Sequence, residues 1–189
     1  AGLGEIEKEL KSLPGTFLED AAVNSRLRGV GLLTRQQAHD LGAVGPFMRA
    51  SGIALDNRKL GYAAYGELNF EPITSDVGDC YARCDVRIRE IFQSIDLIRQ
   101  AVARIPGGEV AVPFKGFPEG EYFMREEQPR GEALYYVKAN GTKFIERFRV
   151  RTPTFANLPG LLETLKGCQL ADVPILILTI DPCISCTER

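Results

Sequence analysis

The sequence predicts an α+β fold in which residues 1–106 are mainly helical and residues 107–189 carry a small antiparallel sheet. Two patterns support this prediction. A helical apolar stripe extends through residues 76–105, and two β-rich runs flank an Asn-Gly pair between residues 133 and 151. The chain shows no internal repeat, low-complexity segment or charge run, so we treat residues 1–189 as one unit.

The composition is that of an ordinary globular protein. Of its 189 residues, 44% are hydrophobic and 25% are charged, which is enough apolar material for a buried core. The net charge is −2, from 23 basic and 25 acidic residues, so charge gives no argument for nucleic acid as a partner. We expect no transmembrane segment, because no apolar run approaches about 20 residues, and we expect no signal peptide.

Two short helices are predicted near the start. Residues 3–13 place apolar side chains at helical spacing, and Pro14-Gly15 ends that helix. Thr34 followed by Gln37 is typical of a capping box, which predicts a helix from Arg35 to about Leu41. His39 lies on this helix, where we interpret it as a surface imidazole.

The segment from 42 to 53 is rich in glycine and small residues, which predicts a tight, buried loop. The long helix of residues 76–105 follows, with one apolar face, and Pro106-Gly107-Gly108 ends it. Cys80 and Cys84 lie one turn apart on this face. A helical metal pair is one reading, but we favour two small buried hydrophobic residues.

Residues 107–128 contain many Gly, Pro and Glu residues, and we expect a long irregular excursion there. A hairpin follows, made of runs 133–138 and 144–151 around Asn140-Gly141. Its second run alternates Phe148 and Val150 with arginines, so one face should be solvated or paired.

The last third returns to the core. A short helix is expected from Pro153 to about Gly167. Residues 170–180 form a nearly continuous apolar run that should be buried, as a strand or a short helix. This run leads from the core directly into Asp181-Pro182-Cys183.

Two thiols at C-x-x-C spacing, Cys183 and Cys186, are the clearest chemical feature. Five cysteines in a chain of this size do not resemble a secreted disulfide framework, so we expect a reducing compartment. Thiolates are soft ligands that select nickel, iron, copper(I) or zinc. On spacing alone, the pair fits half of a zinc site, a redox dithiol or a pair of thiolates that binds one metal ion.

Several segments together resemble one known family. They are Arg28-Gly29-Val30-Gly31, Leu41-Gly42-Ala43-Val44-Gly45-Pro46, Arg49-Ala50-Ser51-Gly52-Ile53, Gly78-Asp79-x-Tyr81-x-Arg83, Pro129-Arg130-Gly131-Glu132 and the terminal Asp-Pro-Cys-x-x-Cys-x-x-Arg. This set resembles the large, catalytic subunit of nickel–iron (NiFe) hydrogenases. The likeness is closest to the energy-converting, membrane-associated (Ech-type) branch, which is related to the large peripheral-arm subunit of respiratory complex I.

The resemblance implies roles for individual residues. Cys183 corresponds to a thiolate bound to nickel alone, and Cys186 to one bridging nickel and an iron that carries CO and cyanide. Arg130 resembles the arginine whose guanidinium lies above the open coordination position of the nickel–iron centre, and Pro129 shapes the backbone there. Asp181 resembles the carboxylate paired with that arginine region.

Thr154 corresponds to a hydroxyl that donates a hydrogen bond to a cyanide. A cysteine of the terminal motif is the expected proton relay, with Glu132 as a second candidate.

The resemblance also implies an incomplete site. The family uses four cysteine ligands, two from an N-terminal Arg-x-Cys-Gly-x-Cys motif, and these 189 residues contain no such motif. Cys80 and Cys84 have a different spacing. We therefore expect a C-terminal portion, an incomplete half of the large-subunit fold, whose end at Arg189 fits the family's cleavage point. Alone, the chain is expected to bind no Ni-Fe(CO)(CN)2 centre and to lack hydrogenase activity.

The partners implied are an N-terminal half carrying the other two cysteine ligands, an iron–sulfur small subunit and membrane ion-translocating subunits. The implied location is the cytoplasmic side of a membrane, as a peripheral subunit. The implied reaction is reversible proton reduction to H2.

Two other functions compete with this one. The first is a complex I-like subunit without a NiFe centre, which shapes a quinone site or assists assembly. The retained Cys183 and Cys186 argue against it, since that relative lacks these thiols. The second is a zinc or dithiol module. The sequence has no second C-x-x-C and no thioredoxin-like βαβ pattern, and both absences argue against this function.

Overall fold

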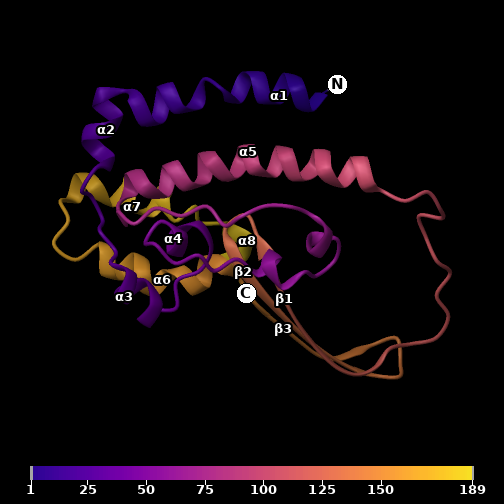
Figure 1. Ribbon diagram of the computed structural model, residues 1–189. Helices are drawn as coiled ribbons and strands as arrows, with labels where there is room; N and C mark the ends of the chain where they lie inside the picture. Colours follow the sequence, from indigo (N-terminus) through magenta and orange to yellow (C-terminus); the bar gives the residue numbers. More distant parts are fainter. Residues whose placement is uncertain (1, 189) are drawn as a thin grey trace.

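The computed structural model describes residues 2–188, and one long helix runs the length of its helical body. In Figure 1, α1 (Gly2–Leu10) lies along one side of α5 (Cys80–Arg104). On the other side of α5 lie α4 (Gly45–Arg49), α6 (Pro153–Thr164) and α7 (Val173–Thr179). The shorter helical elements are the π-helix η1 (Gly15–Glu19), α2 (Ala21–Leu27), α3 (Arg35–Asp40), the 3-10 helices η2 (Asn57–Leu60), η3 (Tyr65–Glu67) and η4 (Leu170–Asp172), and α8 (Ile184–Thr187).

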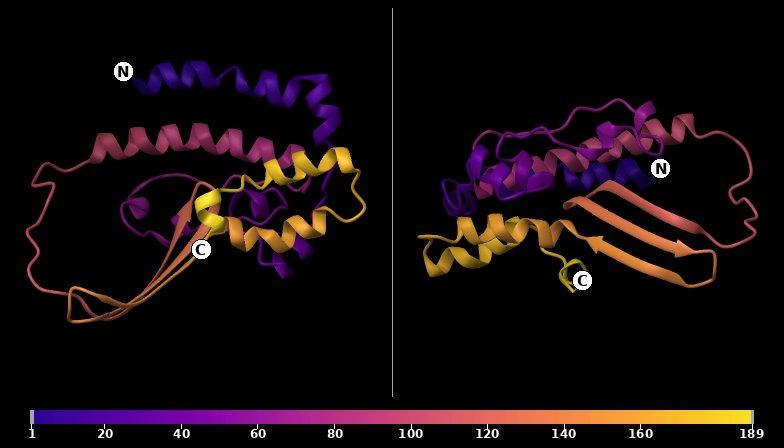
Figure 2. Two further views of the ribbon diagram at one scale, coloured as in Figure 1. Left: turned by 180° about the vertical axis from the view of Figure 1, so that it is seen from behind. Right: turned by 90° about the horizontal axis from the view of Figure 1, so that it is seen from below.

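Within residues 2–188 the strands form one antiparallel sheet in the order β1-β2-β3. The strands are β1 (Glu119–Gln128), β2 (Gly131–Asn140) and β3 (Ile145–Arg151). Figure 2 shows the sheet projecting away from the helices as a separate arm. The predicted hairpin is therefore confirmed as β2-β3, and the predicted α+β class with it.

The prediction of an irregular segment over residues 107–128 is wrong for its second half. Residues 119–128 form β1 and pair with β2 along its whole length, from Glu119 opposite Asn140 to Gln128 opposite Gly131. Charged residues dominate β1 and give it little strand propensity. Its pairing with β2 supplies the backbone hydrogen bonds that the local sequence does not favour.

The long helix α5 is confirmed, with its start at Cys80. The Asp79 carboxylate caps it by accepting a hydrogen bond from the backbone N–H of Ala82 at 2.8 Å. The predicted apolar face is only partly buried, however, because Ile91, Ile98, Val102 and Ile105 are 38%, 45%, 66% and 76% exposed. The end of α5 extends past the elements that cover its beginning (Figure 1).

The main core forms where α4, α6 and α7 meet the start of α5. Its largest fully buried apolar side chains are Phe47, Leu33, Leu176, Ile180 and Cys80. Residues 42–53 are largely buried as predicted, but their centre is the helix α4 rather than a loop.

Two short segments match or correct the sequence predictions. Thr34 and Gln37 form the predicted capping box of α3, and His39 is a surface residue with a 77% exposed side chain. The run 170–180 is helical and only partly buried: Leu176 is buried, whereas Leu170 is 88% exposed. A helix turns only one face to the core, so a continuous apolar run need not be buried on every side.

A buried arginine joins four separate segments. Arg49, 1% exposed, donates from Nε to the Glu90 carboxylate on α5 at 2.7 Å and from Nη1 to Glu127 on β1 at 2.8 Å. Asp56 lies 3.7 Å away and is itself paired with Arg58 at 2.6 Å. Burial lowers the pKa of Arg49, but the neighbouring carboxylates outweigh it and raise the pKa overall.

None of the helices in the described part is both long and apolar enough to cross a bilayer.

The Arg49 cluster leads to a stability prediction. Arg49→Met should lower the free energy of unfolding by about 3–5 kcal/mol, because it leaves buried carboxylates without their cation. Urea unfolding followed by circular dichroism measures this. Lys59→Met removes an exposed pair with Glu71 and should cost less than about 1 kcal/mol. Equal losses in the two variants would refute the role given to Arg49.

A second prediction concerns Gly45, whose φ is +66°. A Cβ there would meet the Gly131 Cα and would lie 2.5 Å from the Arg130 carbonyl oxygen. Gly29 is the matched control, because its φ is +70° and an added Cβ meets nothing within 4 Å. Gly45→Ala should therefore lower the free energy of unfolding by about 1–3 kcal/mol more than Gly29→Ala. Similar losses would mean that only the backbone conformation matters, and thermal unfolding of both variants decides this.

Candidate functional site

The turn between β1 and β2 presents Arg130. Gln128 pairs with Gly131, which leaves Pro129 and Arg130 as a two-residue connection at the end of the sheet nearest the helices. The turn packs directly on the start of α4: a Cβ built on Gly131 would lie 2.8 Å from the Gly45 nitrogen. Two glycines in contact thus fix the position of the Arg130 backbone.

The strand residues on either side of this turn are held by η2. The Asn57 backbone N–H donates to Glu127 at 3.2 Å, and its side-chain amide donates to Glu132 at 2.9 Å. Glu132 also accepts from Arg151 and lies 3.4 Å from Arg125. These contacts give Glu132 a structural part in holding the sheet to the body. Asn57 was not singled out from the sequence, since its partners lie at least 70 positions away.

The Arg130 side chain reaches the terminal segment. Its Nε donates to the Asp181 backbone oxygen at 2.8 Å, and Nη2 lies 3.3 Å from the Asp181 carboxylate. Asp181 has φ +56°, a left-handed conformation that Asp tolerates better than most residues. The chain turns sharply there, directly after the last residues of the core.

Thr154 holds the next residues of the terminal segment. It lies at the start of α6, is 1% exposed, and its hydroxyl accepts the backbone N–H of Cys183 at 3.2 Å. The same hydroxyl hydrogen-bonds to the Cys186 thiol. Thr152, beside it, donates its hydroxyl hydrogen to the Cys186 carbonyl. The N-terminus of α6 therefore fixes both ends of the C-x-x-C segment.

The two thiols of this segment differ in acidity. A hydrogen bond from Ser185, 3.1 Å away, contacts with Cys186 and the charge of Arg130 together lower the pKa of Cys183 to about 7. Burial raises the pKa of Cys186, and the hydrogen bond and charge of Cys183 raise it too. At neutral pH, Cys183 is the thiol that ionises first.

The sequence-predicted residues therefore meet in one place. Pro129 and Arg130 come from the sheet, Thr154 from α6, and Asp181, Cys183 and Cys186 from the terminal segment. Arg189, the last residue of the motif, lies outside the described residues. Residues 2–188 contain no cluster of three or more His, Cys, Asp or Glu side chains that could hold a metal ion.

The other cysteines lie elsewhere. Cys80 is fully buried beneath α7 and Cys84 packs against the same core, as the sequence interpretation expected. Burial raises the pKa of both thiols. Cys168 is a free, half-buried thiol that also contacts the core. These three thiols behave as packing residues.

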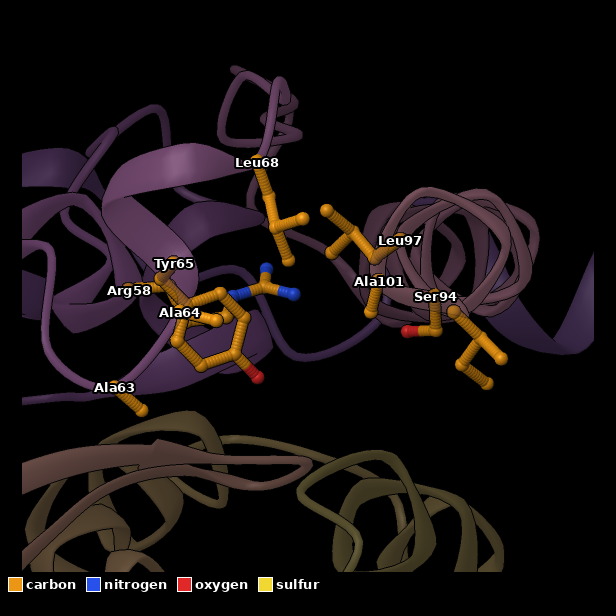
Figure 3. A pocket seen from close by; sticks show the side chains of 9 residues that line it. Arg58, Ala63, Ala64, Tyr65, Leu68, Ser94, Leu97 and Ala101 are labelled. Atoms are coloured by element: carbon orange, nitrogen blue, oxygen red, sulfur yellow. The ribbon is translucent and has the colours of Figure 1, made fainter. Parts of the chain in front are cut away.

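Two cavities flank the long helix. One of about 540 Å³ reaches from α1 and α5 to Pro129 and Asp181, so it adjoins the site just described. The other, of about 320 Å³, lies between η3 and α5. Figure 3 shows the Arg58 guanidinium extending from the loop side toward Leu97 in this smaller cavity, beside the Tyr65 ring.

Comparison with known proteins gives the family. The sequence profile described as "Respiratory-chain NADH dehydrogenase, 49 Kd subunit" matches residues 1–116 and 113–189. The carbon monoxide-induced hydrogenase of Rhodospirillum rubrum is 42% identical over 193 residues, covering 99% of this chain and 54% of the relative. The membrane-bound hydrogenase subunit alpha of Pyrococcus furiosus is 38% identical over 200 residues, covering 95% and 46%.

A third relative belongs to a quinone-linked enzyme. It is a subunit of the NADH-quinone oxidoreductase of Syntrophobacter fumaroxidans, 41% identical over 170 residues, covering 87% of this chain and 45% of the relative. The chain thus spans about half the length of these curated relatives. Hydrogenase and quinone oxidoreductase subunits are similar to it to nearly the same degree, which confirms the resemblance to hydrogenases related to complex I. The chain belongs to the family of the 49 kDa subunit of respiratory-chain NADH dehydrogenase.

Proposed function

We propose that the chain is the part of a hydrogenase large subunit that supplies two thiolates and a neighbouring arginine to a nickel–iron centre. The proposed reaction is the reversible interconversion of protons and H2. One observation carries the proposal: Arg130 pairs with Asp181, which leads into the C-x-x-C segment, and Thr154 contacts Cys183 within that segment. This groups the two soft ligands with a permanent cation and a hydroxyl donor.

The donor set fits part of such a centre. Cys183 and Cys186 would hold the metals, and Pro129, Arg130 and Thr154 would border the open side. When bound, the centre supplies the redox chemistry and polarises H2. Two further thiolates are required, and we propose that they come from the part of the family fold that this chain does not span.

The chain's own residues then have distinct roles. The Arg130 guanidinium holds a positive charge beside the thiols. Its pairing with Asp181 fixes its direction. Thr154 binds the Cys183 backbone and the Cys186 sulfur, which keeps the two thiols oriented. Cys183 can hold or release a proton at Sγ near neutral pH, so it is the proposed proton relay.

The proposal includes the partners that this chemistry needs. An iron–sulfur small subunit would deliver electrons, and membrane ion-translocating subunits would couple the reaction to ion movement. In this arrangement the chain is a peripheral subunit on the cytoplasmic side of a membrane. The 189-residue chain alone should be inactive, because two thiolates leave the centre half-ligated.

A complex I-like role is the second candidate function. The 41% identity to a NADH-quinone oxidoreductase subunit favours it. In that case the same surface would shape a quinone site or an assembly contact without nickel or iron. The retained C-x-x-C favours the hydrogenase proposal, since a quinone site has no need of two soft ligands.

A first prediction tests whether Cys183 and Cys186 bind nickel in the complex. The native complex containing this chain should contain nickel and should reduce methyl viologen with H2. Cys183→Ser and Cys186→Ser should each lower that activity by at least about a hundredfold and deplete nickel, because each removes a ligand. Cys168→Ser, a thiol that packs against the core, is the matched control and should keep both.

Metal analysis of the purified complexes separates the two candidate functions. A complex free of nickel that reduces quinone would contradict the hydrogenase proposal and favour the complex I-like one. Nickel retained in both the Cys183 and the Cys186 variants would contradict the ligand assignment.

A second prediction concerns the acidity of Cys183 in the metal-free chain. Only the thiolate reacts with iodoacetamide, so a lowered pKa shifts the reaction toward neutral pH. Labelling of Cys183, followed by mass spectrometry of its peptide, should rise with a midpoint near pH 7, and Cys186 should follow at higher pH. Ser185→Ala should move the Cys183 midpoint upward, because it removes the hydrogen bond that lowers the pKa most. Identical midpoints for the two thiols would contradict this picture.

A further inference from the structure

One arginine on α5 is fully buried and forms no ion pair within residues 2–188. Arg83 has an exposed fraction of 0%, and its hydrogen bonds go to neutral groups: the carbonyls of Gly31 and Gly78, the Thr179 hydroxyl and the Cys80 thiol. Its Nε has no hydrogen-bond partner in this part of the chain. Burial lowers the pKa of Arg83 to about 10, the direction expected for a cation removed from water. An apolar side chain would fill this place at a lower cost, which indicates that Arg83 serves to hold its partners in position.

The partners of Arg83 belong to three different segments. Nη2 donates to the Gly31 carbonyl in the loop after α2, and to the Gly78 carbonyl just before α5 at 3.1 Å. Nη1 donates to the hydroxyl of Thr179, the last residue of α7, at 3.4 Å. Helix α7 packs against α5, and Figure 1 shows it beside the start of that helix. Arg83 therefore links the start of α5 to the end of α7.

The same arginine also holds the loop on which α7 rests. Leu176 of α7 is fully buried, and a Cβ built on Gly31 would lie 2.1 Å from its Cδ2. Leu176 and Gly31 are therefore in direct contact, and Arg83 binds the Gly31 carbonyl. The Thr179 hydroxyl, which accepts from Arg83, donates in turn to the Leu176 carbonyl at 3.1 Å. Arg83 thus acts on α7 both at its buried side and at its end.

The end of α7 leads directly into the candidate site. After Thr179 comes Ile180, which is 1% exposed, and the Asp181 N–H donates back to an α7 carbonyl at 3.0 Å. The Asp181 carbonyl accepts from Arg130, and the Cys183 N–H follows two residues later on Thr154. No flexible connection separates α7 from these contacts, so a shift of the α7 end would displace Asp181 and the start of the C-x-x-C segment.

We propose that Arg83 is a positioning residue for the candidate site. By fixing the end of α7, it sets where Asp181 meets Arg130 and where the C-x-x-C segment begins. Its hydrogen bonds do not reach the two thiols of that segment, so it acts through Thr179 and Gly31. The inference rests on the proposed function for the importance of the segment, whereas the position of the segment can be tested without metal.

Hydrogen exchange of the metal-free 189-residue chain, followed at single amides by NMR, tests the proposal. Thr179→Val removes the hydroxyl that Arg83 contacts and keeps the size of the side chain. It should speed exchange of the Asp181 and Cys183 amides by about threefold to tenfold, because the link to α5 is lost. Amides in the middle of α5 should keep their rates, which separates a local shift from a loss of global stability.

Thr164→Val is the matched control. Thr164 is also a buried threonine, and its hydroxyl donates to the carbonyl three residues earlier at 2.8 Å, as that of Thr179 does at 3.1 Å. Arg83 contacts only the second of these two hydroxyls. Thr164→Val should therefore leave the Asp181 and Cys183 amides at their parent rates.

Two further variants assign the effect to the pair. Thr179→Ser restores the hydroxyl and should return both amides to within about twofold of the parent rates. Arg83→Met should speed the same two amides about as much as Thr179→Val does. In the Arg83→Met background, Thr179→Val should add less than about twofold, because the hydrogen bond is already absent.

Three results would overturn the proposal: parent exchange rates in Thr179→Val, an equal acceleration in Thr164→Val, or no restoration by Thr179→Ser. If Arg83→Met does not fold, the comparison of the two Thr179 variants decides alone. Nickel content and hydrogenase activity enter none of these readouts. A failure here therefore leaves the proposed function intact, and a native complex without nickel leaves the link between Arg83 and α7 intact.

Discussion

The Arg49 ion cluster is the interaction on which the arrangement of the molecule depends. It joins α4, the segment at Asp56, the middle of α5 and the end of β1 through one buried guanidinium. Buried ion pairs contribute little net stability compared with apolar packing, but they tolerate few alternative geometries. The cluster therefore acts mainly as a constraint on orientation. It determines where the sheet leaves the helical body, and the β1-β2 turn lies immediately beyond it.

The geometry of the candidate site depends on the orientation that the Arg49 cluster imposes on the sheet. Arg130 follows Glu127 by three residues, and Asn57 ties the same strand end to η2. On the other side, α6 presents Thr154 from within the core. The terminal segment thus lies between two supports that are each fixed by buried contacts. Sites built on such supports keep their groups in place more precisely than sites on free loops.

Local patterns in the sequence were sufficient for the long helix, the β2-β3 hairpin and the α3 capping box. They failed for β1, where a segment rich in charged residues becomes a strand only because β2 offers ten residues of pairing. They also failed for residues 170–180, because composition reports apolarity but not which side faces the core. The site residues came from a motif, and their roles stay predictions. No local sequence pattern marks Gly45 or Asn57, because their importance arises from contacts with residues far along the chain.

The projecting sheet has a mechanical consequence. Arg130 closes one end of a continuous hydrogen-bonded ladder, and the far end carries Phe144 and Phe148, which are 69% and 49% exposed. Antiparallel strands resist stretching and shear along their length, so they transmit displacement over the whole ladder. A displacement of the aromatic end would be carried along the paired strands to the β1-β2 turn that holds Arg130. The sheet therefore links an exposed aromatic end to Arg130, which pairs with Asp181 at the start of the thiol segment.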